Sequence, residues 1–280
     1  MIYVLQSAVP LISSAIVIGH LQTELAVAVA FEETEPTRTA RRRLLENNFD
    51  QAPVVNGGVP VGYVLRSELE RGRGNVGAYV RPILPSALVS SQCPLEDALP
   101  WLEVTRFLFV LTDRSVSGFV APSDLNRQAG RAYFSLSVVA LEIELADIVR
   151  RLNRQTDVLS LLPPNVARAV RSRLKRRSEA NVEADVVAEM NLSHLFQIIG
   201  SDPNLLEGFG FDSYGSWRCA YQPVRDLRNR LAHPAQPLLG SDAELPWLVE
   251  VGRLTQDLLD RATGIAAGAA GLPDSRAADA

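Results

Sequence analysis

The sequence contains an internal repeat, which limits the fold more than any single motif because two similar segments must build two similar units. PVVNGGVPVGYVLRSEL (residues 53–69) aligns without gaps with FVLTDRSVSGFVAPSDL (residues 109–125). Five pairs are identical: Val54/Val110, Gly62/Gly118, Val64/Val120, Ser67/Ser123 and Leu69/Leu125. The constant offset indicates that the first half of the chain consists of two copies of one structural unit.

The two copies have the same predicted order of elements. An extended stretch comes first (residues 25–31 or 87–91), then a helix (39–48 or 94–104), then a short apolar strand (52–55 or 107–111). A turn and a second strand follow, and Asn56-Gly57 between apolar runs is a strong hairpin signal. A second helix is then expected to begin at Ser67-Glu68 or Ser123-Asp124, where Ser and Asp suit the N-cap. Each copy therefore reads β-α-β-β-α.

This doubled pattern resembles a tandem pair of CBS domains, the Bateman module, over about residues 18–128. The copies would cover about residues 18–72 and 83–128 of an α+β domain at residues 1–130. The resemblance implies clefts between the copies that bind an adenine nucleotide such as AMP, ADP or ATP. It also implies that two chains pair as a homodimer.

The ligand motif of that family is a Gly, two apolar residues, a Thr or Ser, two more residues and an Asp. The copies here read GYVLRSE (residues 62–68) and GFVAPSD (residues 118–124). In the family the Asp binds ribose hydroxyls and the hydroxyl of the Thr or Ser binds phosphate. Leu65 and Ala121 stand at the Thr or Ser position here and have no hydroxyl. The arginine next to Leu65 could bind phosphate instead. The residues implied in nucleotide binding are Asp124, Ser123, Glu68, Ser67 and Arg66. The alternative interpretation is that the Ser-Glu and Ser-Asp pairs only cap helices.

Composition restricts the chemistry. The net charge is −4, so any nucleic-acid binding requires a local basic patch. The two cysteines, Cys93 and Cys219, and the three histidines are scattered, so we expect no metal site and no disulfide framework, as in a reducing cytoplasm. The apolar start, residues 1–21, lacks a basic leader and contains Pro10, so we expect it to join a core rather than to direct export.

The second half of the sequence is helical in pattern. From residue 131, apolar residues recur at steps of three and four along one long helix: Phe134, Val138, Leu141, Leu145, Ile148 and Leu152. Pro163-Pro164 is expected to stop the preceding segment, and Asn165 to cap the next helix. That helix carries six basic residues: Arg168, Arg171, Arg173, Lys175, Arg176 and Arg177. They form either a solvated helix face or an RNA-binding patch.

The stretch DLRNRLAHP (residues 226–234) closes a later helix. Arg228 and His233 would be about 140° apart around an ideal helix. Pro234 disfavours helical geometry at the residue before it, so we expect His233 to leave the helix and to share a small space with Arg228. The other interpretation is a histidine that interacts favourably with a helix carboxyl end.

Four features together resemble a HEPN domain with its R-x4-6-H motif, over about residues 131–262. They are the long acid-bearing helix, the NLSHLFQII segment (residues 191–199), Trp217, and LRNRLAHP (residues 227–234). The resemblance implies an all-α bundle that dimerises at the motif and, in many members, cleaves RNA without metal in toxin or defence systems. His233 would then be the general acid or base, Arg228 would stabilise charge on the scissile phosphate, and Asn229 would orient either partner.

These inferences predict a cytoplasmic homodimer that makes no membrane contact, with residues 263–280 as a disordered tail. The predicted function is a metal-independent ribonuclease regulated by an adenine nucleotide, with no required cofactor. Two alternatives stay open. One is a non-catalytic nucleotide sensor or dimerisation protein whose helical domain binds RNA or a protein partner. The other is a structural dimer with empty clefts.

Overall fold

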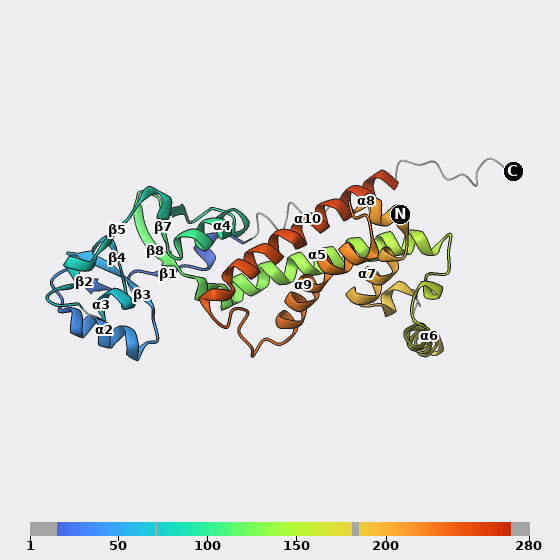
Figure 1. The fold of residues 1–280 in the computed structure, drawn as a ribbon, viewed down its shortest axis with the longest axis horizontal. Coiled ribbons are helices and arrows are strands. Elements are labelled where there is room, and N and C mark those ends of the chain that lie inside the picture. The colour runs from blue at the N-terminus through green and yellow to red at the C-terminus, as the bar shows by residue number, and fades with distance from the viewer. Residues whose placement is uncertain (1–15, 71, 181–184, 270–280) are drawn as a thin grey trace. The chain divides into compact units, whose positions relative to one another are not determined.

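The computed structural model describes residues 16–70, 72–180 and 185–269, so the apolar start up to residue 15 and the tail from residue 270 lie outside the described residues. The chain divides into two compact units (Figure 1). We call residues 16–130 with 241–245 the repeat unit. Residues 131–240 with 246–269 form the helical unit. Residues 263–269, expected in the tail, are helical.

The repeat unit contains two four-stranded sheets. The first copy contributes β1 (Thr23–Glu24), β2 (Phe31–Glu32), α2 (Thr37–Glu46), β3 (Gln51–Asn56), β4 (Val59–Leu65) and α3 (Arg66–Leu69). The second contributes β5 (Arg81–Pro82), β6 (Leu88–Ser90), α4 (Leu95–Thr105), β7 (Leu108–Thr112), β8 (Ser115–Val120) and the 3₁₀ helix η4 (Pro122–Asn126). Three further 3₁₀ turns are η1 (Ile18–His20), η2 (Val76–Tyr79) and η3 (Pro85–Ala87).

Both copies adopt the predicted β-α-β-β order followed by a helical turn. β2 pairs in parallel with β3 across α2, and β6 pairs in parallel with β7 across α4. The hairpins β3–β4 and β7–β8 are antiparallel. Gly57 and Gly58 form the first turn with positive φ angles of 58° and 82°, which glycine adopts without steric cost. The predicted Asn-Gly hairpin is therefore confirmed.

Each sheet is completed by a strand that precedes the other copy's hairpin. The sheet orders are β1-β8-β7-β6 and β2-β3-β4-β5, so β1 pairs with β8 and β5 pairs with β4. The repeated glycine of the motif makes this possible. A Cβ on Gly62 would stand 2.1 Å from the Arg81 carbonyl oxygen, and one on Gly118 would stand 2.5 Å from that of Thr23. Glycine thus occupies both of these aligned positions because the backbone of the neighbouring strand lies too close for a side chain.

An aromatic stack joins the two copies inside the repeat unit. The ring of Phe107 lies between Tyr63 of the first copy and Phe119 of the second, at centroid distances of 5.2 and 4.8 Å. Phe109 meets Phe107 edge to face at 5.0 Å. Tyr63 and Phe119 are equivalent residues of the repeat, so the two sheets meet around one shared buried side chain, Phe107.

Several local expectations were wrong. Residues 25–28 form turns and a bend, and residues 29 and 30 have no regular structure, so only Phe31 of the expected extended stretch lies in a strand. Ser67 and Ser123 do not cap their helices: the N-cap residues are Leu65 and Ala121, and the Asp124 carboxylate accepts the Ala121 N–H at 2.8 Å. Asn165 is not a cap either. Its helix begins at Pro164, because a proline in the first turn lacks only an N–H that would be unpaired there.

The helical unit contains six α-helices within the described residues. They are α5 (Gln128–Asn153), α6 (Pro164–Glu179), α7 (Leu192–Gly200), α8 (Pro203–Gly208), α9 (Tyr214–Ala232) and α10 (Leu245–Ala269). Shorter 3₁₀ turns are η5 (Val158–Leu161), η6 (Val187–Glu189) and η7 (Asp242–Glu244). The small bridging segment of residues 241–245 clusters with the repeat unit, and the rest of α10 packs in the helical unit.

The two long helices, α5 and α10, run parallel and side by side (Figure 1). The ring of Phe134 approaches Gly252. Near the carboxyl ends of the two helices, Arg151 donates a hydrogen bond to the carbonyl oxygen of Ala266. The predicted apolar stripe of α5 is buried from Phe134 to Ile148. Apolar burial along this stripe is therefore what holds the long helix in place.

Trp217 anchors α9 against α7. Its indole N–H donates to the Phe196 carbonyl at 2.7 Å, and its ring stacks on that of Phe196 at 4.6 Å. Phe209 and Phe211 surround it at 5.0 and 5.2 Å. A Cβ on Gly200 would stand 2.6 Å from the indole, so α7 has to end in a glycine for Trp217 to fit. This packing positions the carboxyl end of α9, which carries Arg228 and Asn229 in its last turns.

Candidate functional site

Arg228 and Asn229 lie together in a hollow of about 200 Å³ between α7 and α9. Both side chains are exposed. The other lining side chains include Ser193, Tyr221 and Arg225. The α9 residues of this set recur at intervals of three and four, so they follow one face of the helix. Arg225 forms an ion pair with Asp226 at 3.3 Å, and Arg228, the arginine of the motif, lines the same hollow.

His233 leaves the helix where the sequence predicts. α9 ends at Ala232, and His233 is the C-cap with φ −114° and ψ 80°, which is outside helical geometry. Its side chain is exposed and is not among the residues that line the hollow. Within one chain, the structure thus brings Arg228 and Asn229 together and places His233 one turn further along.

Tyr221 and Ser193 are part of the hollow although the sequence analysis did not select them. Their hydroxyl groups are hydrogen-bonded, and burial raises the pKa of Tyr221 above its ordinary value. Next to it, Arg218 and Tyr214 line a second hollow that shares Ser193, Tyr221 and Arg225 with the first. The repetition of aromatic and basic residues along α9 was a visible signal, but only the packing of α7 shows which of them face a groove.

The six basic residues of α6 remain a net positive patch. Arg171 contacts Asp157 at 3.5 Å, and Lys175 contacts Glu179 at 3.8 Å. Arg173 and Arg177 both contact Glu189. Arg168 is exposed, and Arg176 donates to the Ser172 carbonyl at 3.5 Å. Three acids therefore oppose six cations, and the surface keeps three positive charges available to an anion.

Asp124 is buried in the repeat unit, with 4% of its surface exposed. Its carboxylate accepts from the Ala121 N–H and forms an ion pair with Arg127 at 3.0 Å. Arg127 also donates to the Thr23 hydroxyl at 2.8 Å. Burial nevertheless raises the pKa of Asp124, and these partners offset the effect only in part. Ser123, beside it, is exposed.

Glu68, the equivalent acid of the first copy, lies nearer to solvent. Arg81 of β5 contacts its carboxylate through two nitrogens, at 2.6 and 3.1 Å. Arg66 forms an ion pair with Asp50. Ser67 is exposed on the same short helix. The first-copy acid is therefore partly exposed and paired with Arg81, while the second-copy acid, Asp124, is buried.

The described residues contain no group of three or more His, Cys, Asp or Glu side chains arranged to hold a metal ion. Cys93 is half-buried and Cys219 is exposed, and both are free thiols. Among the helices of the described ranges, none is both long enough and apolar enough to span a bilayer.

The solved structures named below are similar to the amino-terminal part of this chain. No protein-family model matches the sequence, and no curated protein matches it. Among solved structures, the CBS domain of a bacterial CNNM/CorC family Mg²⁺ transporter in complex with ATP is 17% identical, with 41% of this chain and 88% of that chain covered and a TM-score of 0.36. CBSX2 in complex with AMP is 20% identical over 43% of this chain and 98% of that chain, with a TM-score of 0.37. A putative acetoin utilization protein (AcuB) from Vibrio cholerae is 14% identical over 39% of this chain and 86% of that chain, with a TM-score of 0.35.

Proposed function

We propose that this protein is a HEPN-type, metal-independent ribonuclease whose activity responds to an adenine nucleotide bound by a CBS pair in its repeat unit. The observation that carries the ribonuclease proposal is the end of α9. Arg228 and Asn229 share one hollow there, and His233 has left the helix just beyond them. These three residue types supply a cation, an orienting amide and a proton carrier, which suffice for phosphodiester transfer.

The reaction would proceed by internal transfer. The RNA 2′-oxygen attacks phosphorus, the P–O5′ bond breaks, and the products are a 2′,3′-cyclic phosphate and a 5′-hydroxyl end. His233 takes the 2′-hydroxyl proton or protonates the leaving 5′-oxygen, roles for which an imidazole is suited because its ring nitrogens can both accept and donate a proton. Arg228 stabilises the charge that develops on the phosphate oxygens. A homodimer would supply two copies of His233, one for each proton transfer.

Two basic surfaces of the helical unit are suited to the rest of the RNA. The α7–α9 groove combines Arg218, Arg225 and Arg228 with aromatic side chains such as Tyr221. Guanidinium groups bind backbone phosphates and aromatic rings stack on unpaired bases. The α6 patch adds three uncompensated positive charges. A single-stranded RNA is therefore the substrate that these surfaces favour.

The nucleotide response is proposed from the repeat unit. Its two copies present an acid at the same motif position, and Glu68 is partly exposed while Asp124 is buried. A ligand at this unit regulates cleavage only if it binds one arrangement of the protein more tightly than another. Glu68 would accept hydrogen bonds from ribose hydroxyls, and Arg66 would bind phosphate.

The ribonuclease proposal is tested by incubating single-stranded RNA with the full chain in EDTA. The wild type should produce 2′,3′-cyclic phosphate ends, and His233→Ala and Arg228→Ala should lose at least about a hundredfold in rate. Arg114→Ala, an exposed arginine in the turn between β7 and β8 and outside both basic surfaces, is the control and should cut within about twofold of wild type. Equal cleavage by His233→Ala would remove the catalytic assignment.

The exposure of His233 outside the hollow favours a second candidate, a non-catalytic RNA-binding nucleotide sensor. In that case the wild type would bind labelled RNA without cutting it, and Arg228→Ala would weaken binding while His233→Ala would not. Nucleotide binding is tested separately by thermal unfolding with AMP, ADP and ATP. A ligand at 100 times its dissociation constant adds about 2.7 kcal/mol, and Glu68→Gln should abolish that gain.

A further inference from the structure

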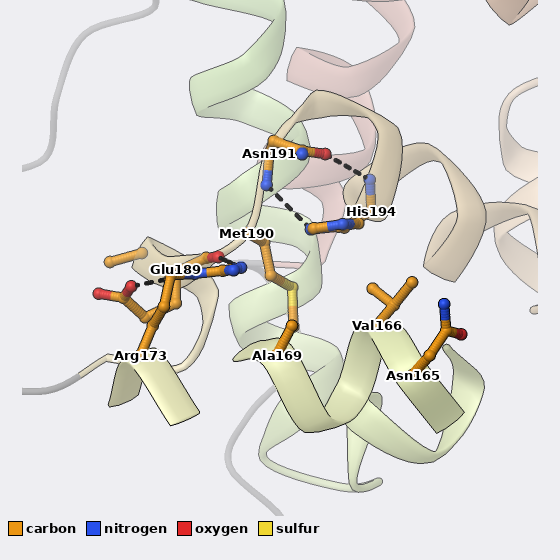
Figure 2. Close-up of a pocket in the computed structure, with 9 residues that line it drawn as sticks. Asn165, Val166, Ala169, Arg173, Glu189, Met190, Asn191 and His194 are labelled. Carbon is orange, nitrogen blue, oxygen red and sulfur yellow. Dashed lines mark hydrogen bonds and ion pairs between the residues drawn. The ribbon is translucent and has the colours of Figure 1, made fainter. Parts of the chain in front are cut away.

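A second pocket of the helical unit lies beside the hollow that contains Arg228 and Asn229, and Asn191 lines both. It has a volume of about 570 Å³ and lies between α6 and the segment that leads from η6 into α7 (Figure 2). One wall is a face of α6 from Asn165 to Arg173, and the other runs from Ala188 to His194. This volume is in the range of small-molecule sites, which is about 300–1,000 Å³.

A cluster of one acid and two arginines lies at one wall of the pocket, which Arg173 and Glu189 line and Arg177 does not. The Glu189 carboxylate, with only 6% of its side chain exposed, lies between Arg177 at 2.5 Å and Arg173 at 3.5 Å. Arg173 also donates to the Glu189 carbonyl at 2.7 Å, which holds its guanidinium at the pocket wall (Figure 2). One carboxylate against two guanidinium groups leaves one positive charge uncompensated. The Glu189 carboxylate is buried, and losing its partners would leave that charge unpaired, so the ion pair holds the Arg173 guanidinium, which is itself 40% exposed, at the pocket.

Hydrogen-bond donors converge on the same space. The Nδ1 atom of His194 accepts the Asn191 N–H at 3.3 Å, so the neutral imidazole carries its proton on Nε2 and is a donor there. The Asn191 side-chain oxygen accepts a hydrogen bond from the backbone N–H of His194 at 3.1 Å. The other polar group of the Asn191 side chain is its NH₂, which is a donor. Burial and then the charge of Arg173 lower the pKa of His194, which keeps the imidazole neutral at pH 7. Asn165 adds an amide at the opposite side.

The remaining lining is apolar, from Val166, Ala169 and Met190. Donors on separate walls match a tetrahedral group with several acceptor oxygens better than a planar carboxylate, which offers two oxygens in one plane. The apolar part matches a flat or aliphatic body. We propose that this α6–α7 pocket binds a small phosphate monoester, with Arg173, His194, Asn191 and Asn165 around the phosphate and Met190 against the body of the ligand.

The experiment uses the full chain labelled at histidine and followed by NMR. His194→Gln assigns the imidazole signal of His194 among the three histidines. Titration with AMP should move that signal saturably, and inorganic phosphate should move it at higher concentration. Adenosine, which lacks the phosphate, should leave it unchanged. A His194 signal that stays in place up to millimolar AMP and phosphate would overturn the proposal.

Variants separate this pocket from the repeat unit. Arg173→Gln and Asn165→Ala should each weaken AMP binding read at His194 by about tenfold, the loss expected for a hydrogen bond to a charged group. Asn165 is exposed, so its variant keeps the fold even if Arg173→Gln disturbs Glu189. Glu68→Gln should leave the His194 titration unchanged. If Asn165→Ala and Arg173→Gln bind as the wild type does, or if Glu68→Gln removes the His194 response, the pocket does not bind the phosphate.

Discussion

The guanidinium of Arg131, at the start of α5, donates to the carbonyl oxygen of Arg230, in the last turn of α9, at 3.2 Å. It also donates to the Gln236 carbonyl at 2.9 Å, beyond the helix end. The last carbonyls of a helix have no partner within the helix, so a cation there satisfies them and opposes the helix dipole. Arg131 therefore fixes the backbone on both sides of His233.

We expect Arg131→Ala to lower the free energy of unfolding by about 1–2 kcal/mol, because carbonyls at the end of α9 lose a charged donor. RNA cleavage should fall more than stability does, since His233 loses a fixed backbone. Urea denaturation and the EDTA cleavage assay measure the two effects. Arg114→Ala, at an exposed arginine in the β7–β8 turn, is the control and should change stability by less than about 0.5 kcal/mol. Unchanged values for both Arg131→Ala measurements would contradict this role.

Pro234 should determine the position of His233. In Pro234→Ala the restriction on the preceding residue is gone, so α9 can extend through His233. The His233 side chain would then point in the direction that helical geometry gives it, about 100° around the axis from that of Ala232. We expect at least about a tenfold loss of cleavage with stability changed by less than about 1 kcal/mol. NMR of the backbone at residues 232–235 shows whether the helix has lengthened. A lengthened helix with full cleavage would mean that the position of His233 is irrelevant to the reaction.

The motif glycines should not tolerate even one methyl group. Gly62→Ala would place a Cβ 2.1 Å from the Arg81 carbonyl oxygen, so β5 has to move away from β4. We expect a loss of about 1–3 kcal/mol, and a similar loss for Gly118→Ala, measured by thermal unfolding. Gly264→Ala is the control, because its Cβ meets nothing within 4 Å in α10. That change should stabilise the protein by up to about 1 kcal/mol.

Phe107 should be the most sensitive residue between the two copies. It is fully buried and lies between the rings of Tyr63 and Phe119. Phe107→Ala leaves a cavity and removes both stacked contacts, so we expect a loss of about 3–5 kcal/mol in calorimetry. Val104→Ala, at a site that is 83% exposed on α4, should change stability by less than about 0.5 kcal/mol. A small effect of Phe107→Ala would show that the copies are held together elsewhere.

Asp124 should make the stability of the repeat unit depend on pH. Burial raises its folded pKa above the ordinary value of 3.8, so the native state holds a proton that the unfolded chain has released. Stability therefore falls as pH rises from about 3.8 through the folded pKa, and it is constant above that. Asp124→Asn does not titrate, so the wild type should lose stability relative to this variant across that window. Urea titrations at several pH values measure the difference; a difference that runs the other way would mean that the Arg127 ion pair outweighs burial.

The sequence alone determined the local elements of this protein. The offset between the two copies predicted both hairpins, the three-and-four spacing predicted the buried stripe of α5, and Pro234 predicted the departure of His233 from α9. These features depend on neighbours within a few residues or on direct similarity between copies. They are encoded in propensities and spacing, which a single chain displays without its fold.

Only the tertiary structure decided which distant segments meet. β1 and β5 each pair with a strand of the opposite copy, so the motif glycines lie against the backbone of Thr23 and Arg81. The repeat pattern does not predict these two contacts. Asp124 is buried and pairs with Arg127, whereas Glu68 is partly exposed and pairs with Arg81, although the two acids are equivalent in the repeat. The pocket at His194 likewise exists because α6 packs against the start of α7. Burial and long-range pairing depend on how the whole chain fills space, and that is a property no local pattern contains.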